Sequence, residues 1–124
     1  MENILVVILA LAFYLLLKRI MPVVGVRHKT PSELRDQLKV KDKQFIDVRS
    51  SEAYNREHIR GFENIPLSEL SVNIQKLERS NEVILISDNN RQMKRASAKL
   101  KRRGFRYVTT VRGGLQAWNE GGSK

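Results

Sequence analysis

The chain opens with one long apolar run. From Ile4 to Leu17 fourteen residues carry no charge, and Lys18 and Arg19 follow directly. As a helix this run covers about 21 Å, short of the roughly 30 Å hydrocarbon core of a bilayer. The aliphatic stems of Lys18 and Arg19 can lie among the acyl chains while their charges reach the interface, so that residues 4–21 contact lipid. The pattern therefore predicts a transmembrane anchor helix over residues 1–22, ended by Pro22.

Two other interpretations of this segment are less favoured. A cleaved signal peptide needs a basic start and a small-residue cleavage site, but Glu2 is the only charge before the run and residues 21–24 read MPVV. A buried helix that is apolar on every face needs a larger protein around it. Because the flanking Lys and Arg residues all follow the run, the positive-inside rule places the rest of the chain in the cytoplasm, and we expect a bacterial plasma membrane.

After the anchor, short apolar segments alternate between strand-like and helix-like spacing. A connector at residues 22–27 precedes Thr30-Pro31-Ser32-Glu33, a capping box that starts a helix through Leu38. The further strands predicted are 45–48, 83–86 and 107–111, and the further helices are 51–58, 67–77, 91–103 and one between the glycine pairs 113–114 and 121–122. This alternation predicts one α/β domain over residues 23–124, with a parallel central sheet between helices.

Composition excludes one class of chemistry and leaves others open. The chain has no cysteine, which excludes disulfides, thiolate metal sites and any thiol nucleophile. With 23 Lys and Arg against 13 Asp and Glu, its net charge is +10, which favours anionic surfaces. We expect no metal and no cofactor, and the oligomeric state stays open.

The segment 91–103 concentrates this charge, with seven basic residues and no acidic one. It is either a solvated helix face or a surface that docks on anionic lipid headgroups or on another membrane protein. Nucleic acid is less favoured as a partner, because no aromatic side chains interleave with the charges. The residues predicted for this docking face are Lys94, Arg95, Lys99, Arg102 and Arg103.

Two motifs together resemble the rhodanese-like domain family. FIDVRSSEAYNREHIRGFENIPL at residues 45–67 is similar to its first signature, and VRGGLQAWNEGG at 111–122 to its closing signature. Because the motifs stand in the right order and spacing, the resemblance is specific. It implies a rhodanese-like three-layer fold in which the central strand ends at a catalytic cysteine and a loop of the form C-x-x-G-x-R.

In this chain the resemblance places Ser87 at the cysteine, Asn90 at the glycine and Gln92 at the arginine of that loop, with Arg91 one residue early as a partial substitute. A hydroxyl cannot carry the persulfide that such an enzyme forms, so we expect no sulfurtransferase activity and a binding or regulatory role. A loop that still binds an anion would use residues 87–93: Ser87, Asp88, Asn89, Asn90, Arg91, Gln92 and Met93.

An enzyme that uses Ser87 as a nucleophile on a sulfur or phosphate oxyanion ester is the alternative. It needs a base, and His28, His58, Asp47 and Asp88 are the candidates. We expect a different role for three supporting residues: Asp47 bonds loop or helix amides, Arg49 pairs with a carboxylate such as Glu52, and His58 packs or bonds in a turn. Ser87 itself would cap the helix that follows it, and Trp118 would lie in the core.

Overall fold

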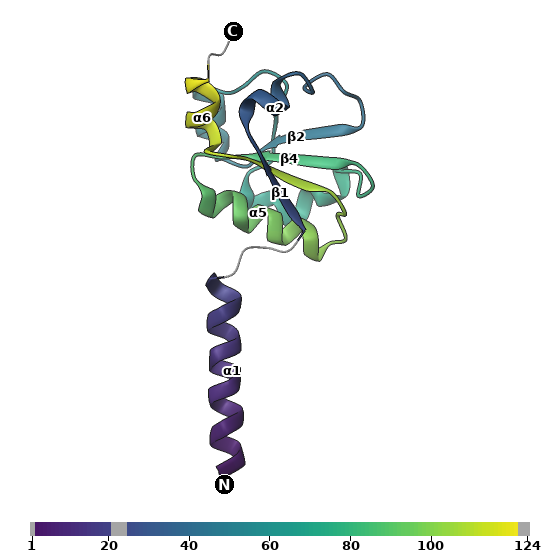
Figure 1. The fold of residues 1–124 in the computed structure, drawn as a ribbon. Helices are drawn as coiled ribbons and strands as arrows, with labels where there is room; N and C mark the ends of the chain where they lie inside the picture. Colours follow the sequence, from purple (N-terminus) through teal and green to yellow (C-terminus); the bar gives the residue numbers. More distant parts are fainter. Residues whose placement is uncertain (1, 21–24, 122–124) are drawn as a thin grey trace.

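The computed structural model describes residues 2–20 and 25–121 of the chain. The first element, α1 (Glu2–Ile20), is a continuous helix, as the apolar run predicts, and it projects from an α/β domain (Figure 1). Pro22, the predicted end of this helix and of the anchor region, lies outside the described residues, as does Gly122 at the end of the last helix.

The large apolar side chains of α1 are exposed from Ile4 to Leu16. Ile4, Phe13 and Leu16 are each more than half exposed, and so are the large apolar residues between them. Across residues 2–20 and 25–121, no helix is both long and apolar enough to pass through a membrane. The predicted transmembrane span is therefore not confirmed, although the helix itself is.

Five parallel strands form the central sheet in the order β1-β5-β4-β2-β3, which confirms the predicted parallel sheet. Their bounds are β1 Val26–Lys29, β2 Lys43–Asp47, β3 Glu63–Asn64, β4 Glu82–Ile86 and β5 Val108–Val111. The two edge strands were not predicted, and the first half of β1 was assigned to a connector. The reason is physical: β1 reads VRHK and β3 has two residues, so neither has an apolar pattern, and both exist through pairing with β5 and β2.

The helices of the domain are α2 Pro31–Arg35, α3 Ser51–Arg56, α4 Leu70–Asn73, α5 Asn90–Arg102 and α6 Gly114–Glu120, with 3₁₀ turns η1 Leu67–Glu69 and η2 Ile74–Lys76. α2 and α3 are shorter than their patterns predict, whereas α5 and α6 agree with theirs. The capping box is confirmed, since Thr30 accepts from Glu33 N–H and the Glu33 carboxylate accepts from Thr30 N–H. The helix predicted over 67–77 is confirmed in extent but not in type, because η1, α4 and η2 follow one another without a break over residues 67–76. Leu70, Ile74 and Leu77, spaced four and three residues apart, are buried by these linked turns as they would be by one α-helix, so the apolar spacing does not separate the two arrangements.

One layer of core lies on each side of the sheet. On one side α5 packs through Met93, Ala96, Ser97 and Leu100. On the other, Trp118 of α6 meets Phe62 edge to face, with ring centroids 5.4 Å apart, so Trp118 is a core residue. Figure 1 shows α5 below the sheet and α2 and α6 above it. This arrangement gathers the ends of β2 and β4 beside the starts of α5 and α6.

Candidate functional site

Ser87 follows the last residue of β4 and is fully buried. Its carbonyl oxygen accepts a hydrogen bond of 2.9 Å from the N–H of Leu115. This approach requires glycine at position 114, where φ is +63° and any Cβ would collide with the Ser87 carbonyl oxygen. The second of the two glycines in the closing motif thus fixes the Ser87 loop against α6.

The Ser87 hydroxyl donates its hydrogen bond to the side-chain carbonyl of Gln92, one turn into α5. Asn89 caps that helix, with its side-chain oxygen accepting from the N–H of Gln92 at 2.8 Å. The prediction that Ser87 is the cap is therefore wrong, because Asn89 occupies that place with an extended backbone. Asn90, at the glycine position of the family loop, is the first residue of α5 and has a negative φ.

Asp47 and Arg49 form a buried ion pair behind this loop. The Arg49 guanidinium donates to both oxygens of Asp47 at 2.9–3.1 Å and to the Glu57 carbonyl at 2.6 Å. Burial lowers the pKa of Arg49, but its hydrogen bonds to Asp47 and the charge of Asp47 outweigh that effect and raise it. Asp88 is a second, exposed partner at 3.9 Å. The predicted pairing with Glu52 is wrong, because Glu52 lies exposed at the start of α3.

Asp47 accepts from one backbone amide, the N–H of Arg49, at 3.0 Å. The amide side chain of Asn64 holds the turn that follows, donating to the carbonyls of Asp47 at 2.9 Å and Arg49 at 3.0 Å. These hydrogen bonds hold the side chains of Asp47 and Arg49 in the turn after β2. Neither is hydrogen-bonded to Ser87 in the part of the chain that the structure describes.

The two histidines lie elsewhere. His58 stacks on Tyr54, with ring centroids 3.9 Å apart, and bonds the Tyr54 carbonyl through Nδ1 at 2.8 Å. His28 stands on β1, and its Nδ1 lies 2.6 Å from the Thr110 hydroxyl. No base among residues 2–20 and 25–121 is hydrogen-bonded to Ser87, and within the same ranges no group of three His, Asp or Glu side chains could hold a metal ion.

The exposed face of α5 carries the basic residues that the sequence singles out. Arg91, Lys94, Arg95, Arg102 and Arg103 are exposed and Lys99 is half-buried. None of them takes part in an ion pair of the described residues. Lys94 instead points its ammonium group at the carbonyl of Arg19, in the last turn of α1, at 3.5 Å. We call Lys94, Arg95, Lys99, Arg102 and Arg103 the basic face.

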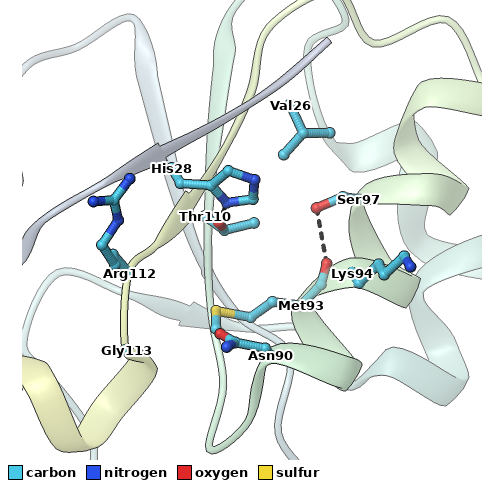
Figure 2. A pocket seen from close by; sticks show the side chains of 9 residues that line it. All are labelled: Val26, His28, Asn90, Met93, Lys94, Ser97, Thr110, Arg112 and Gly113. Carbon is cyan, nitrogen blue, oxygen red and sulfur yellow. Dashed lines mark hydrogen bonds between the residues drawn. The ribbon is translucent and has the colours of Figure 1, made fainter. Parts of the chain in front are cut away.

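A cavity of about 380 Å³ lies between β1, β5 and α5, beside the Ser87 loop (Figure 2). Nine residues line it: Val26, His28, Asn90, Met93, Lys94, Ser97, Thr110, Arg112 and Gly113. This cavity could not be predicted from the sequence, because one of its walls is β1, the strand without an apolar pattern. Of its lining, only Asn90, Met93, Lys94 and His28 were singled out, for other roles.

Comparison with known proteins identifies the family. Residues 30–121 match the family model of the rhodanese-like domain. The chain is 33% identical over 74 residues to YrkF of Bacillus subtilis (strain 168), a protein named as a proposed sulfur carrier, and the match covers 60% of this chain and 40% of YrkF. It is 30% identical over 125 residues to the uncharacterized protein YqhL of the same organism, with 95% of this chain and 94% of YqhL covered.

Among solved structures, the crystal structure of the Alr3790 protein from Anabaena sp. superposes with a TM-score of 0.71 at 28% identity. That match covers 76% of this chain and 77% of the other. The parallel sheet, the helices on both of its faces and the loop after β4 agree with the fold that the two sequence motifs imply. The chain belongs to the rhodanese-like domain family.

Proposed function

We propose that this chain is a membrane-attached rhodanese-like binding module without sulfurtransferase activity, held at the cytoplasmic face of the membrane. The observation that supports the absence of sulfurtransferase activity is the position of Ser87. This residue stands where the family resemblance places the cysteine, and its buried hydroxyl is bonded to Gln92.

The chemistry of sulfur transfer supports this proposal. The reaction needs a thiolate that accepts a sulfur atom as a persulfide, and the thiolate is stabilised by nearby positive charge. The chain has no cysteine, and Asp88 adds a negative charge next to Ser87. The nearest buried cation, Arg49, is already neutralised by Asp47. The loop therefore has neither the nucleophile nor the electrostatics for that step.

Attachment to a membrane is supported by α1 and the basic face. The apolar side chains of α1 are exposed on all sides, and Lys18 and Arg19 mark its carboxyl end. The basic face carries positive charges that no carboxylate of the described residues neutralises. Each basic residue near an anionic leaflet contributes about 1 kcal/mol of attraction. The partner of the module is then anionic headgroups or another membrane protein beside them.

The alternative, an enzyme with Ser87 as nucleophile, finds less support. A serine hydroxyl needs a base within hydrogen-bonding distance, and the Ser87 hydroxyl has the Gln92 carbonyl there instead. If the alternative held, Ser87→Ala would abolish turnover of an oxyanion ester. Under our proposal the same variant binds its partners as the unchanged chain does.

The proposal is tested by mixing the pure full chain with thiosulfate and cyanide. We expect no thiocyanate above the blank. The matched control is Ser87→Ala, which must give the same reading as the unchanged chain if the loop is inert. Turnover by the unchanged chain that disappears in Ser87→Ala would overturn the proposal and support the enzyme.

A further inference from the structure

We propose that the cavity between β1, β5 and α5 binds a phosphate monoester, presented by a soluble metabolite or by the headgroup of an anionic phospholipid. The cavity shares Asn90 and Met93 with the segment 87–93, but it does not include the degenerate nucleophile position. Ser87 does not line it, and the Ser87 hydroxyl is already bonded to Gln92. The inference holds whether or not the loop is catalytically inert.

The charge of the cavity points to an anion. Its lining includes Lys94, Arg112 and His28, and none of its nine lining residues is acidic. Neither Lys94 nor Arg112 takes part in an ion pair of the residues that the structure describes. Arg112 and Lys94 lie at opposite rims of the cavity with their charged ends directed outward, and Lys94 also contacts the Arg19 carbonyl. The cations therefore attract an anion to the mouth of a space into which His28 projects.

The polar and apolar groups inside the cavity suit an ester. Figure 2 shows the His28 ring projecting into the space, the Asn90 amide on the opposite wall, and Arg112 and Lys94 at opposite sides. The Ser97 hydroxyl donates to the Met93 carbonyl at 2.8 Å, and the Thr110 hydroxyl is paired with Nδ1 of His28 at 2.6 Å. The Asn90 amide and Nε2 of His28 remain as the uncharged polar groups. Val26 and Met93 offer apolar contact to the carbon part of a ligand. The volume of about 380 Å³ is within the range of small-molecule sites.

The cavity also lies close to the end of α1. Six peptide units join Ile20 to Val26, so the two residues can be no more than about 22 Å apart. Lys94 belongs both to the cavity lining and to the contact with the Arg19 carbonyl. A headgroup in a bilayer that holds α1 is therefore within reach of the cavity, which is why both sources of the phosphate must be tested.

Met93 provides a specific probe for the test. It is 2 % exposed, it lines the cavity, and the two other methionines of the chain are Met1 and Met21. The full chain, labelled with ¹³C at the methionine methyl groups, is placed in phosphatidylcholine nanodiscs. One arm adds glycerol 3-phosphate, and the other replaces part of the lipid by phosphatidic acid. We expect the Met93 methyl resonance to shift in a saturable way in at least one arm.

The two arms separate the sources. A shift with glycerol 3-phosphate in neutral nanodiscs assigns the soluble ester, and a shift with phosphatidic acid alone assigns the headgroup. Arg112→Gln should weaken binding about tenfold through the loss of one charge-assisted bond. Arg106→Gln, an exposed arginine just before β5 that does not line the cavity, should leave binding unchanged. Absence of a shift in both arms, or equal binding by Arg112→Gln and the unchanged chain, would overturn the inference.

Discussion

The buried Ser87 hydroxyl and the Gln92 side-chain carbonyl are hydrogen-bonded to each other across the first turn of α5. The family resemblance places a thiol at the first of these positions and a cation at the second. In this chain two uncharged groups stand there and are hydrogen-bonded to each other. The loop therefore has no nucleophile that is free of a hydrogen-bond partner. The side chain of Asn89, which caps α5, accepts a second hydrogen bond from the backbone N–H of Gln92 and so also holds the loop in place.

This pair can be tested with a double-mutant cycle of Ser87→Ala, Gln92→Ala and the double variant. A hydrogen bond of this kind contributes about 0.5–1.5 kcal/mol, so we expect a coupling free energy of that size in urea unfolding of the full chain in mild detergent. Additive effects of the two substitutions would show that the side chains are not bonded.

The Asp47–Arg49 pair should dominate the stability of the turn after β2. Asp47→Asn leaves the buried Arg49 charge without its main partner, and breaking a buried pair in this way costs about 3–5 kcal/mol of unfolding free energy. The matched control is Asp88→Asn, which removes the exposed partner at 3.9 Å and should cost less than about 1 kcal/mol. Equal losses in the two variants would contradict the assignment of Asp47 as the main partner.

Glu82 should make stability depend on pH. Burial raises the pKa of Glu82, but hydrogen bonds from Lys43 and Thr109 and the charges of Lys43 and Lys29 outweigh it and hold the pKa below its ordinary value of 4.5. A carboxyl whose pKa is lower in the folded state stabilises the fold above the unfolded pKa. That contribution disappears as the pH falls through the folded pKa.

The free energy of unfolding of Glu82→Gln should therefore be lower than that of the unchanged chain at neutral pH, and the difference should shrink as the pH falls below 4.5. Glu52→Gln, which removes an exposed glutamate of α3 that forms no ion pair of the described residues, serves as the control for the loss of one negative charge. If the effect of Glu82→Gln grew on acidification, the sign of the pKa shift would be wrong.

The basic face should bind anionic vesicles. Reversing Lys99, Arg102 and Arg103 to Glu should abolish the preference of the full chain for vesicles that contain phosphatidylglycerol over neutral ones, because each basic residue contributes about 1 kcal/mol. Binding is measured by flotation, at low and at high salt. Attachment through α1 to neutral vesicles should remain.

A matched control reverses three exposed basic residues elsewhere on the domain, Lys39, Lys41 and Arg60, with the same change in net charge. This variant should keep the preference for anionic lipid. If both triple variants lost it equally, total charge rather than the basic face would be responsible.

The sequence predicts those strands that are buried on both faces. β4 carries an apolar run, β2 buries Phe45 and Ile46, and β5 buries Val108 and Val111, and each of these strands was located to within two residues. β1 could not be located in this way, since the strand VRHK is set by its register with Val108–Val111 and not by its own side chains. The cavity beside β1 was missed for the same reason.

The resemblance of the sequence to the family also locates the Ser87 loop, because the loop lies between the two matching motifs and the helix that follows it has the expected length. It does not predict the bonds inside the loop. Arg49 has several carboxylates within a few residues, and only burial at the end of β2 selects Asp47 over Glu52. Likewise, whether Ser87 or Asn89 caps α5 depends on backbone angles that the residue types alone leave open.

The central claim, that the loop forms no covalent sulfur intermediate, is tested most directly by the intact mass of the full chain after incubation with thiosulfate. The account predicts that the mass is unchanged, because no thiol is present and the Ser87 hydroxyl is bonded to Gln92. A gain equal to the mass of one sulfur atom that is absent in Ser87→Ala would contradict it.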